Sequence, residues 1–188
     1  MQKLTDGIIL YHGSYCEVPL PELNKCAANK DFGQGFYLTT SREQAESFVK
    51  ASIKKAIAIG LIDSDQNYGF VSSFQYNKIL SLKEYIFDEA NVDWLHCIVG
   101  HRKENTFSDI VENMKNYDII GGKIADDKTN ITITTYLLGG YGEIGSKGAD
   151  SICIGQLIPE RLQNQYCFRT QTALDCLSYK ESEKIWKV

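Results

Sequence analysis

The chain has 188 residues, of which 43% are hydrophobic and 23% are charged, and its formal net charge is −4. This composition is typical of a globular protein and excludes a disordered chain or a fibrous repeat. The length suits one full core, so we predict a single domain over residues 1–188. The small negative charge argues against a scaffold that binds nucleic acid by charge, although a nucleic acid stays open as a substrate.

Two further features bear on localisation and redox state. No apolar stretch approaches the length of a membrane span, and the apolar run near the N-terminus is too short for a signal peptide. We therefore expect a cytoplasmic protein without a membrane partner. The six cysteines form no C-x-x-C pair, and thiols of this kind in a reducing compartment are usually small core residues.

The first half of the chain predicts two strands and a long helix. Residues 7–12 form a short apolar run typical of an inner strand, and residues 35–39 predict a second strand. The helix after it begins at a capping box, Ser41 with Gln44 three residues later. Apolar residues then recur at three- and four-residue steps through Ile57, which gives the helix one apolar face.

The second half contains four apolar runs typical of strands, at residues 70–77, 82–87, 117–125 and 165–170. Asp88 is expected to cap a helix that continues through Ile98. Residues 131–138 are ambiguous, because their β-branched side chains favour a strand locally while tertiary context often overrides such propensity. Residues 172–177 predict a short closing helix. Since strands and helices do not alternate strictly, the pattern favours an α+β fold over a doubly wound one.

His12 ends an otherwise apolar row, because alternate side chains of a strand share a face and place it beside Ile8 and Leu10. One interpretation is a strand-end histidine that bonds a loop, and the pattern alone favours it. The other is a neutral imidazole that binds a sugar hydroxyl. Gly13 beside it would then let a flat ligand approach the backbone.

The stretch DFGQGFYLTTSREQAESF, from Asp31 to Phe48, raises the weight of the second interpretation. Gly33 and Gly35 permit a turn that other residues resist, and Tyr37 follows on the strand. Phe48 lies eleven residues after Tyr37, on the helix. Such a pair can clamp a planar ring, with stacking worth about 0.5–1.5 kcal/mol. The alternative is that both rings belong to the core.

These motifs resemble the NAD-binding half of the ADP-ribosyltransferases, in particular the branch of the poly(ADP-ribose) polymerases and diphtheria toxin. That branch has a His-Gly on its first strand, a Phe-Gly-x-Gly-x-Tyr strand, and a helix that carries a second aromatic at this spacing. The whole chain, including FDEANVDWL, YDIIGGKIADDK and NQYCFRTQTAL, also resembles an uncharacterised bacterial group within that fold, domain-of-unknown-function family 3990. The resemblance implies an ADP-ribosyltransferase-like α+β fold: a split β-sheet core, flanking helices, and NAD in the cleft.

The resemblance also implies a role for each matched residue. His12 would bond the ribose, and Gly13 would hold the nicotinamide carboxamide through its backbone. Tyr37 and Phe48 would stack on the nicotinamide, although Phe48 stands where the branch usually has a second tyrosine. The predicted NAD-binding residues are His12, Gly13, Ser14, Phe32, Gly35, Tyr37 and Phe48, and the predicted catalytic residues are Gln165, His12 and Tyr37. NAD is the expected co-substrate, and no metal is expected.

Gln165 stands where that family has its third signature residue, a glutamate at the start of a late strand. Strand alternation puts Gln165, Cys167 and Arg169 on one face, with Tyr166 and Phe168 toward the core. A carboxylate would stabilise the positive sugar that forms as nicotinamide leaves, whereas glutamine keeps only the hydrogen bond. The lost charge is worth at most about 4 kcal/mol, or roughly a thousandfold in rate. In the family that the chain resembles, replacement of this glutamate generally goes with transfer of single ADP-ribose units or with loss of activity, so the resemblance implies single rather than chain-building transfer.

Three acidic residues are candidates to replace the missing charge, namely Asp31, Glu43 and Glu160. Nothing in the sequence selects among them, and each is expected to be a solvated surface charge. Gln165 itself could instead satisfy backbone groups at a strand end. Arg169 is a candidate to meet a phosphate or the acceptor.

Two other patterns are set aside. Residues 140–145, GYGEIG, match G-x-G-x-x-G, but too few residues follow for a doubly wound sheet, so we predict a turn. Cys97 and His101 have the spacing of two metal ligands on a helix. No second pair follows, so a core cysteine and a surface histidine are expected.

The sequence therefore predicts a mono-ADP-ribosyltransferase that uses NAD+, releases nicotinamide and modifies an unidentified macromolecular acceptor. Such an activity would suit the toxin of a bacterial toxin–antitoxin system, held in check by a small antitoxin protein. One alternative is an NAD+ glycohydrolase, with water as acceptor. Because of Gln165, another is a catalytically inactive module that binds NAD, ADP-ribose or a protein.

Overall fold

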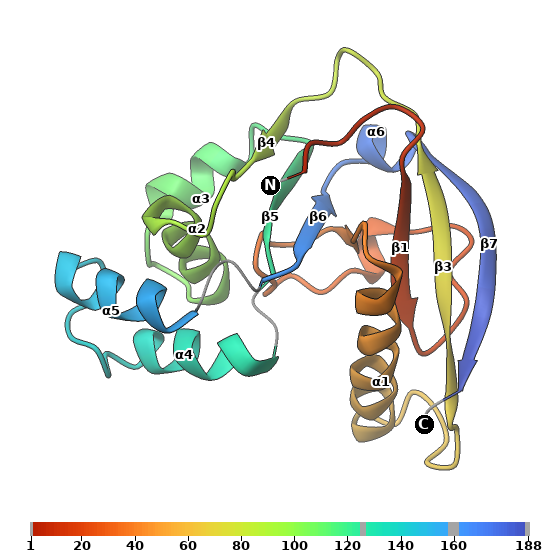
Figure 1. The fold of residues 1–188 in the computed structure, drawn as a ribbon, viewed down its shortest axis with the longest axis horizontal. Coiled ribbons are helices and arrows are strands. Elements are labelled where there is room, and N and C mark those ends of the chain that lie inside the picture. The colour runs from red at the N-terminus through yellow and green to blue at the C-terminus, as the bar shows by residue number, and fades with distance from the viewer. Residues whose placement is uncertain (1, 125–126, 158–161, 187–188) are drawn as a thin grey trace.

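The computed structural model describes residues 2–124, 127–157 and 162–186 (Figure 1). It combines two β-sheets with helices, which confirms the predicted α+β class. The strand order is β1-β3-β7 in one sheet and β2-β6-β5-β4 in the other, and β4 with β5 is the parallel pair. The strands are β1 (Ile9–Ser14), β2 (Phe36–Leu38), β3 (Tyr68–Tyr76), β4 (Glu84–Ile86), β5 (Ile119–Lys123), β6 (Asn164–Phe168) and β7 (Leu177–Trp186).

The helices lie on both sides of the molecule, with α1 against the three-stranded sheet and α2 to α5 together on the other side (Figure 1). They are the 3-10 turn η1 (Leu23–Lys25), α1 (Arg42–Ala58), α2 (Val92–Arg102), α3 (Ser108–Met114), α4 (Asp127–Leu137), α5 (Lys147–Leu157) and α6 (Gln171–Leu174). None of the helices in the described ranges is long and apolar enough to cross a membrane.

The two sheets meet where β1 passes β2. The backbones of Tyr11 and Thr39 exchange two hydrogen bonds, with N–O distances of 2.8 and 3.0 Å. A buried aromatic cluster fills the space between the sheets, in which the rings of Phe36 and Phe74 meet edge to face at 5.5 Å. The predicted strands 7–12 and 35–39 thus become neighbours at one junction, which sets the position of everything they carry.

Helix α1 begins at the predicted cap, since Ser41 Oγ accepts the Gln44 N–H at 3.2 Å. In a capping box the side chain of Gln44 would bond the backbone N–H of Ser41, but here the Thr39 hydroxyl lies between these two groups. This hydroxyl donates to Gln44 Oε1 at 2.8 Å and accepts the Ser41 N–H at 3.1 Å. The apolar face of α1 then packs on the three-stranded sheet, with Val49 and Ile53 against Val71. The cap therefore fixes α1 to the same junction between the sheets.

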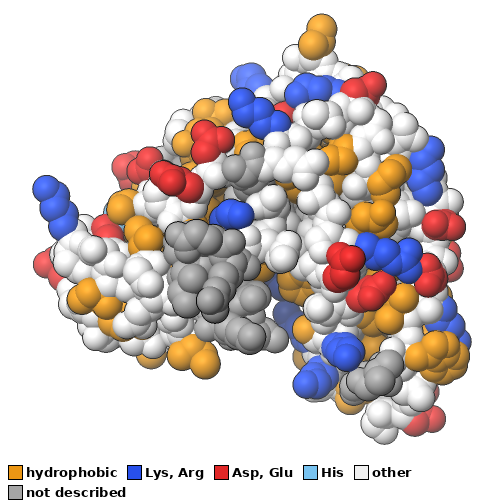
Figure 2. Space-filling view, in the orientation of Figure 1, with side chains coloured by type: hydrophobic (Ala, Val, Ile, Leu, Met, Phe, Trp, Pro, Cys, Tyr) orange, Lys and Arg blue, Asp and Glu red, His pale blue; other side chains and the backbone are white. Residues whose placement is uncertain are grey.

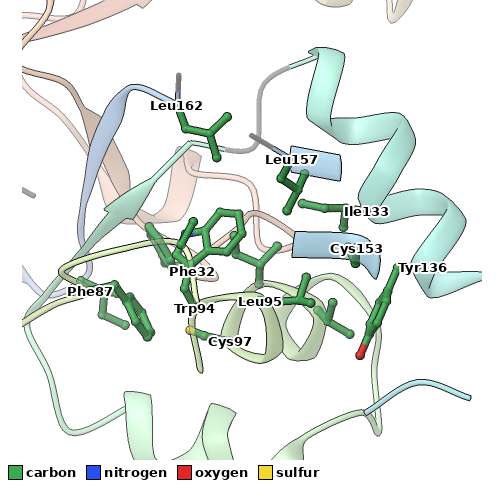
Figure 3. Packing of buried hydrophobic residues seen from close by; sticks show 14 of the residues in the cluster. Phe32, Phe87, Trp94, Leu95, Cys97, Ile133, Tyr136, Cys153, Leu157 and Leu162 are labelled. Carbon is green, nitrogen blue, oxygen red and sulfur yellow. The ribbon is translucent and has the colours of Figure 1, made fainter. Parts of the chain in front are cut away.

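The far face of the four-stranded sheet is covered by a second core, drawn from α2, α4 and α5 (Figure 3). Trp94 of α2 is fully buried there, and its indole N–H donates to the carbonyl of Lys123 at the end of β5. Phe32, from the loop before β2, packs in the same cluster. The loop that carries the predicted glycine turn is therefore anchored in the core.

The second half departs from expectation at four places. Asn91, not Asp88, caps α2, because its side-chain oxygen accepts the Trp94 N–H. The ambiguous residues 131–138 lie largely in α4, whose Ile133 and Tyr136 are buried against α2 and α5. Helices α3 and α5 were not predicted. Strand β7 follows the expected closing helix, and it was missed because most of its residues are exposed and carry no apolar alternation.

Candidate functional site

His12 lies on β1 and bonds across to β2. Its Nδ1 is 2.8 Å from the carbonyl oxygen of Tyr37, and because a carbonyl only accepts, Nδ1 carries the proton. Burial lowers the pKa of His12, although the bond to Tyr37 acts in the opposite direction. The imidazole is therefore neutral near pH 7 and keeps a lone pair on Nε2. That nitrogen can accept a hydrogen bond from a hydroxyl group.

Gly13 allows α1 to pass directly over β1. A Cβ at this position would lie 1.9 Å from the carbonyl oxygen of Ala45 and 3.2 Å from Cβ of Phe48. The close approach brings Phe48 to the strand that carries His12. The Phe48 side chain is 39% exposed, so a ring expected to be either core or ligand-facing presents much of its surface outward.

Tyr37 fastens the glycine turn through its hydroxyl. The hydroxyl donates to the carbonyl of Gly33 at 2.8 Å and accepts the N–H of Phe32 at 2.9 Å. Burial raises the pKa of Tyr37 well above its ordinary value, so the group stays neutral. Gly33 has a φ of +78°, and a Cβ at Gly35 would lie 2.4 Å from Sγ of Cys167. The turn therefore requires both glycines.

Ser14 and Phe32 contribute less directly to the predicted site. Ser14 is buried at the end of β1, with its hydroxyl 3.9 Å from Sγ of Cys16. The Phe32 ring is fully buried in the second core and stacks on Phe87 at 6.0 Å between centroids. It is the backbone of Phe32, rather than its ring, that contacts Tyr37.

Gln165 is the second residue of β6 and lies on the expected face, whereas Tyr166 and Phe168 lie in the core between the sheets. The Gln165 side chain does not bond the backbone at the strand end. Its Nε2 instead donates to Oδ2 of Asp31 at 2.7 Å, and Gln165 is only 7% exposed. An amide and a carboxylate therefore form a buried pair at the position where the sequence predicts the catalytic residue.

Of the two candidate acids that the structure describes, Asp31 is the one that lies at the site. It is 8% exposed, so the expectation of a solvated surface charge is wrong for this residue. The cause is Arg102 at the end of α2, whose Nε and Nη2 lie 2.9 and 2.6 Å from Oδ1 of Asp31. Arg102 also donates to Asn130 at 2.8 Å. Glu43 is exposed as expected, with its carboxylate on the Ser41 hydroxyl, and Glu160 lies outside the described residues.

The remaining candidates have structural partners. Arg169 donates from Nη1 to the carbonyl of Met114. His101 is half-buried rather than a surface residue, because its Nδ1–H donates to the carbonyl of Cys97 at 2.8 Å. Burial lowers the pKa of His101. Within the described ranges, no group of three or more His, Cys, Asp and Glu side chains could hold a metal ion, and the six cysteines are free.

Residues 140–145 form a turn, as expected, although a helix rather than a strand precedes them. The surface is hollowed between the part that carries α4 and α5 and the part that carries α1 (Figure 2).

A family model described as a protein of unknown function (DUF3990) matches residues 8–179. The chain belongs to the DUF3990 family. No curated protein and no solved structure matches it.

The structure of this DUF3990 chain brings together residues from four elements, with His12 and Gly13 on β1, Tyr37 on β2, Phe48 on α1 and Gln165 on β6. Sequence reasoning missed Arg102, which binds the acid, and Asn130, which binds Arg102. Arg102 is 71 residues from Asp31 along the chain, and no local pattern links such a pair. The sequence did contain one indication that Asp31 lies at the site, which is its position beside the glycine turn. That turn leads directly into β2.

Proposed function

We propose that this DUF3990 protein is a mono-ADP-ribosyltransferase with an ADP-ribosyltransferase-like fold, which takes NAD+ as co-substrate and releases nicotinamide. The observation that carries the proposal is the direction of the Gly13 backbone. The N–H and C=O groups of successive strand residues point to alternate sides. Because those of Tyr11 point toward Thr39, those of Gly13 point to the same side, past the bridge between β1 and β2.

A donor and an acceptor in strand geometry match the amide of nicotinamide. A carboxamide presents one oxygen and one NH2 group, and it can pair with both groups of Gly13 as a neighbouring strand would. The Cβ atom of Phe48 lies next to Gly13 across the close contact with α1. Tyr37 approaches from β2, since its carbonyl accepts the His12 N–H. The nicotinamide ring would lie between these two aromatic side chains.

His12 supports binding of the sugar. Its Nε2 lone pair accepts a hydrogen bond from a ribose hydroxyl, while the bond from Nδ1 to Tyr37 fixes the tautomer and the ring orientation. In the reaction, the bond between nicotinamide and ribose C1′ breaks and nicotinamide leaves with the electron pair. A nucleophile of the acceptor then bonds to C1′ and loses its proton. Gln165 contributes an amide group near this carbon.

The test follows nicotinamide release from NAD+ labelled in its adenylate part, with and without bacterial lysate. His12→Asn keeps an N–H near the position of Nδ1 but removes the Nε2 acceptor. We expect the wild type to release nicotinamide and label a macromolecule, and His12→Asn to lose about tenfold or more in kcat/KM. The exposed Asp65→Asn serves as the matched control and keeps wild-type turnover.

Three results would contradict the proposal, and each would lead to a different conclusion. Release of nicotinamide without transfer of label indicates an NAD+ glycohydrolase. Saturable NAD+ binding without release indicates a binding module. Normal turnover in a folded His12→Asn variant would show that the site lies elsewhere.

A further inference from the structure

The two carboxylate oxygens of Asp31 bind different side chains. Oδ1 accepts both bonds from Arg102, at 2.9 and 2.6 Å, and Oδ2 accepts the bond from Gln165 at 2.7 Å. Arg102 is held in turn by Asn130. Burying a carboxylate is costly unless it is paired and hydrogen-bonded, and this arrangement meets both needs. The hydrogen bonds to Asp31 therefore offset the cost of burying its carboxyl group next to Gln165.

The Asp31 carboxylate determines which end of the Gln165 amide faces inward. An ionised carboxylate only accepts hydrogen bonds, so the NH2 group of Gln165 has to point toward it. The oxygen Oε1 then points away from Asp31. Among the residues that the structure describes, no hydrogen-bond donor to Oε1 is found. The amide thus offers an oxygen, rather than an NH2 group, to a ligand.

We propose that Asp31 is a positioning residue that acts through Gln165. The inference rests on the proposed function. Asp31 holds Oε1 of Gln165 toward the ribose of NAD+, where this oxygen accepts a bond from a ribose hydroxyl. The carboxylate also polarises the amide through the bond that Gln165 donates, because linked hydrogen bonds strengthen one another. The negative charge that a glutamate at position 165 would place beside the sugar is present one hydrogen bond further away.

Asp31→Asn tests the orientation without removing the hydrogen bonds. Arg102 has only donors, so it binds the oxygen of the new amide and turns the NH2 group toward Gln165. Gln165 then has to offer its own oxygen to residue 31 and turn its NH2 group toward the sugar. A donor now faces a carbon that becomes positive. We expect kcat to fall by about tenfold to a hundredfold, while the KM for NAD+ stays close to wild type. The Tm should fall, because Arg102 keeps its hydrogen bonds to residue 31 but loses the opposite charge.

Gln165→Glu alone does not place an ionised carboxylate beside the sugar. The new carboxylate would lie within hydrogen-bond distance of the carboxylate of Asp31. Such a pair shares one proton, which raises the pKa of the pair above that of a free carboxyl. A group whose pKa is raised by folding stabilises the protein at low pH and loses that contribution as the pH rises. We therefore expect Gln165→Glu to have a lower Tm than wild type at neutral pH, with the difference shrinking toward pH ~4.

The double variant Asp31→Asn/Gln165→Glu exchanges the two groups. Arg102 binds the oxygen of residue 31, whose NH2 group then donates to the carboxylate at position 165. The other carboxylate oxygen faces the ribose with a full charge. We expect the double variant to have a higher Tm at neutral pH than Gln165→Glu. We also expect it to turn over NAD+ at or above the wild-type rate. Glu43→Gln is the matched control, because it changes the exposed candidate acid and should leave kcat unchanged.

The experiment measures kcat and KM for nicotinamide release, and Tm from pH 4 to pH 8, for wild type and all four variants. A wild-type kcat in Asp31→Asn overturns the role of Asp31 and leaves the transferase intact. A double variant as slow as Asp31→Asn also overturns it. If the wild type releases no nicotinamide, both the transferase and this role fall, and the Tm values then report only a structural pair.

Discussion

Tyr37 contributes two separable groups to the site, a ring and a hydroxyl. The hydroxyl bridges the N–H of Phe32 and the carbonyl of Gly33, so it holds the turn that precedes β2. The backbone carbonyl of the same residue orients His12. The ring is the part that would contact nicotinamide. The hydroxyl of Tyr37 therefore serves the local structure, whereas the proposed function assigns the ring to the ligand, and the two roles can be measured apart.

The variant Tyr37→Phe keeps the ring and removes the bridge. We expect it to cost about 1–3 kcal/mol in the free energy of unfolding, because one buried N–H and one carbonyl lose their partner. The KM for NAD+ should stay near wild type, whereas Tyr37→Ala should weaken NAD+ binding by about threefold to tenfold through lost stacking. Denaturant unfolding of both variants gives the free energy of unfolding, and NAD+ titration gives the affinity for NAD+. Equal NAD+ affinity in wild type and Tyr37→Ala would show that the ring does not stack on the ligand.

The placement of a side chain could be predicted where it depends on nearby sequence. It could not be predicted where it depends on contacts with distant parts of the chain. The side of Gln165 follows from strand alternation, and the burial of Tyr166 confirms it. The burial of Asp31 depends on Arg102, which reaches it only after the chain has formed α2 and folded back. Sequence reasoning treated Asp31 as a surface charge because an isolated aspartate is usually exposed.

At the level of elements, the contact between α1 and β1 brings Phe48 to Gly13. The helix axis comes so close to the strand that only a glycine fits at position 13, where any Cβ would overlap the Ala45 carbonyl. This approach places Phe48 beside the backbone groups of Gly13. The same contact lets α1 bury Val49 and Ile53 on the three-stranded sheet. Stability and the geometry of the site therefore depend on one packing contact.

Substitution of Gly13 by alanine should separate α1 from β1. We expect Gly13→Ala to cost about 3 kcal/mol or more in the free energy of unfolding, because the added methyl overlaps backbone atoms that cannot rotate away. The matched control is Gly155→Ala in α5, where a Cβ would have no atom within 4 Å. An alanine inside a helix should stabilise that variant by about 1 kcal/mol. Thermal unfolding distinguishes them, and equal Tm values would mean that α1 is not held by this contact.

Prediction of the elements succeeded where a pattern was complete within the segment. The Ser41 cap and the apolar face of α1 are both local, and the structure has both. Residues 131–138 could not be assigned, because the helical state of α4 depends on Tyr136 reaching Asp150 of α5, to which its hydroxyl donates. Strand β7 depends on pairing with β3 rather than on its own apolar pattern.

The part of the chain that the structure describes has one core between its sheets and another between the four-stranded sheet and the helices, with a smaller cluster between α1 and the three-stranded sheet. The Asp31 and Arg102 pair links the loop before β2 to α2, and Asn130 extends that link to α4. The predicted α+β class followed from composition and element order. The way in which the helices close over the sheet did not follow, because it depends on this buried charge pair and on contacts such as that between Trp94 and Lys123.

Two half-buried histidines make the stability of the whole molecule sensitive to acid. Burial lowers the pKa of both His12 and His101, and each donates its Nδ1–H to a backbone carbonyl in the neutral form. A histidine in the unfolded chain binds a proton near pH ~6.5, whereas these two resist it in the folded state. Their contribution to stability is therefore fully present above pH ~6.5 and is lost as the pH falls through their folded values.

We accordingly expect the Tm to decrease between pH ~7 and pH ~5, before most carboxylates begin to titrate. The double variant His12→Asn/His101→Asn keeps an N–H donor at each position but cannot bind the extra protons, so its Tm should change less over the same range. NAD+ affinity of the wild type should begin to fall only at a lower pH than the Tm does, once the pH approaches the lowered pKa of the folded His12, because a protonated His12 no longer has a lone pair for the ribose. Calorimetry and NAD+ titration across this range measure both effects. A wild-type Tm that is constant from pH 7 to pH 5 would show that neither histidine is held neutral by the fold.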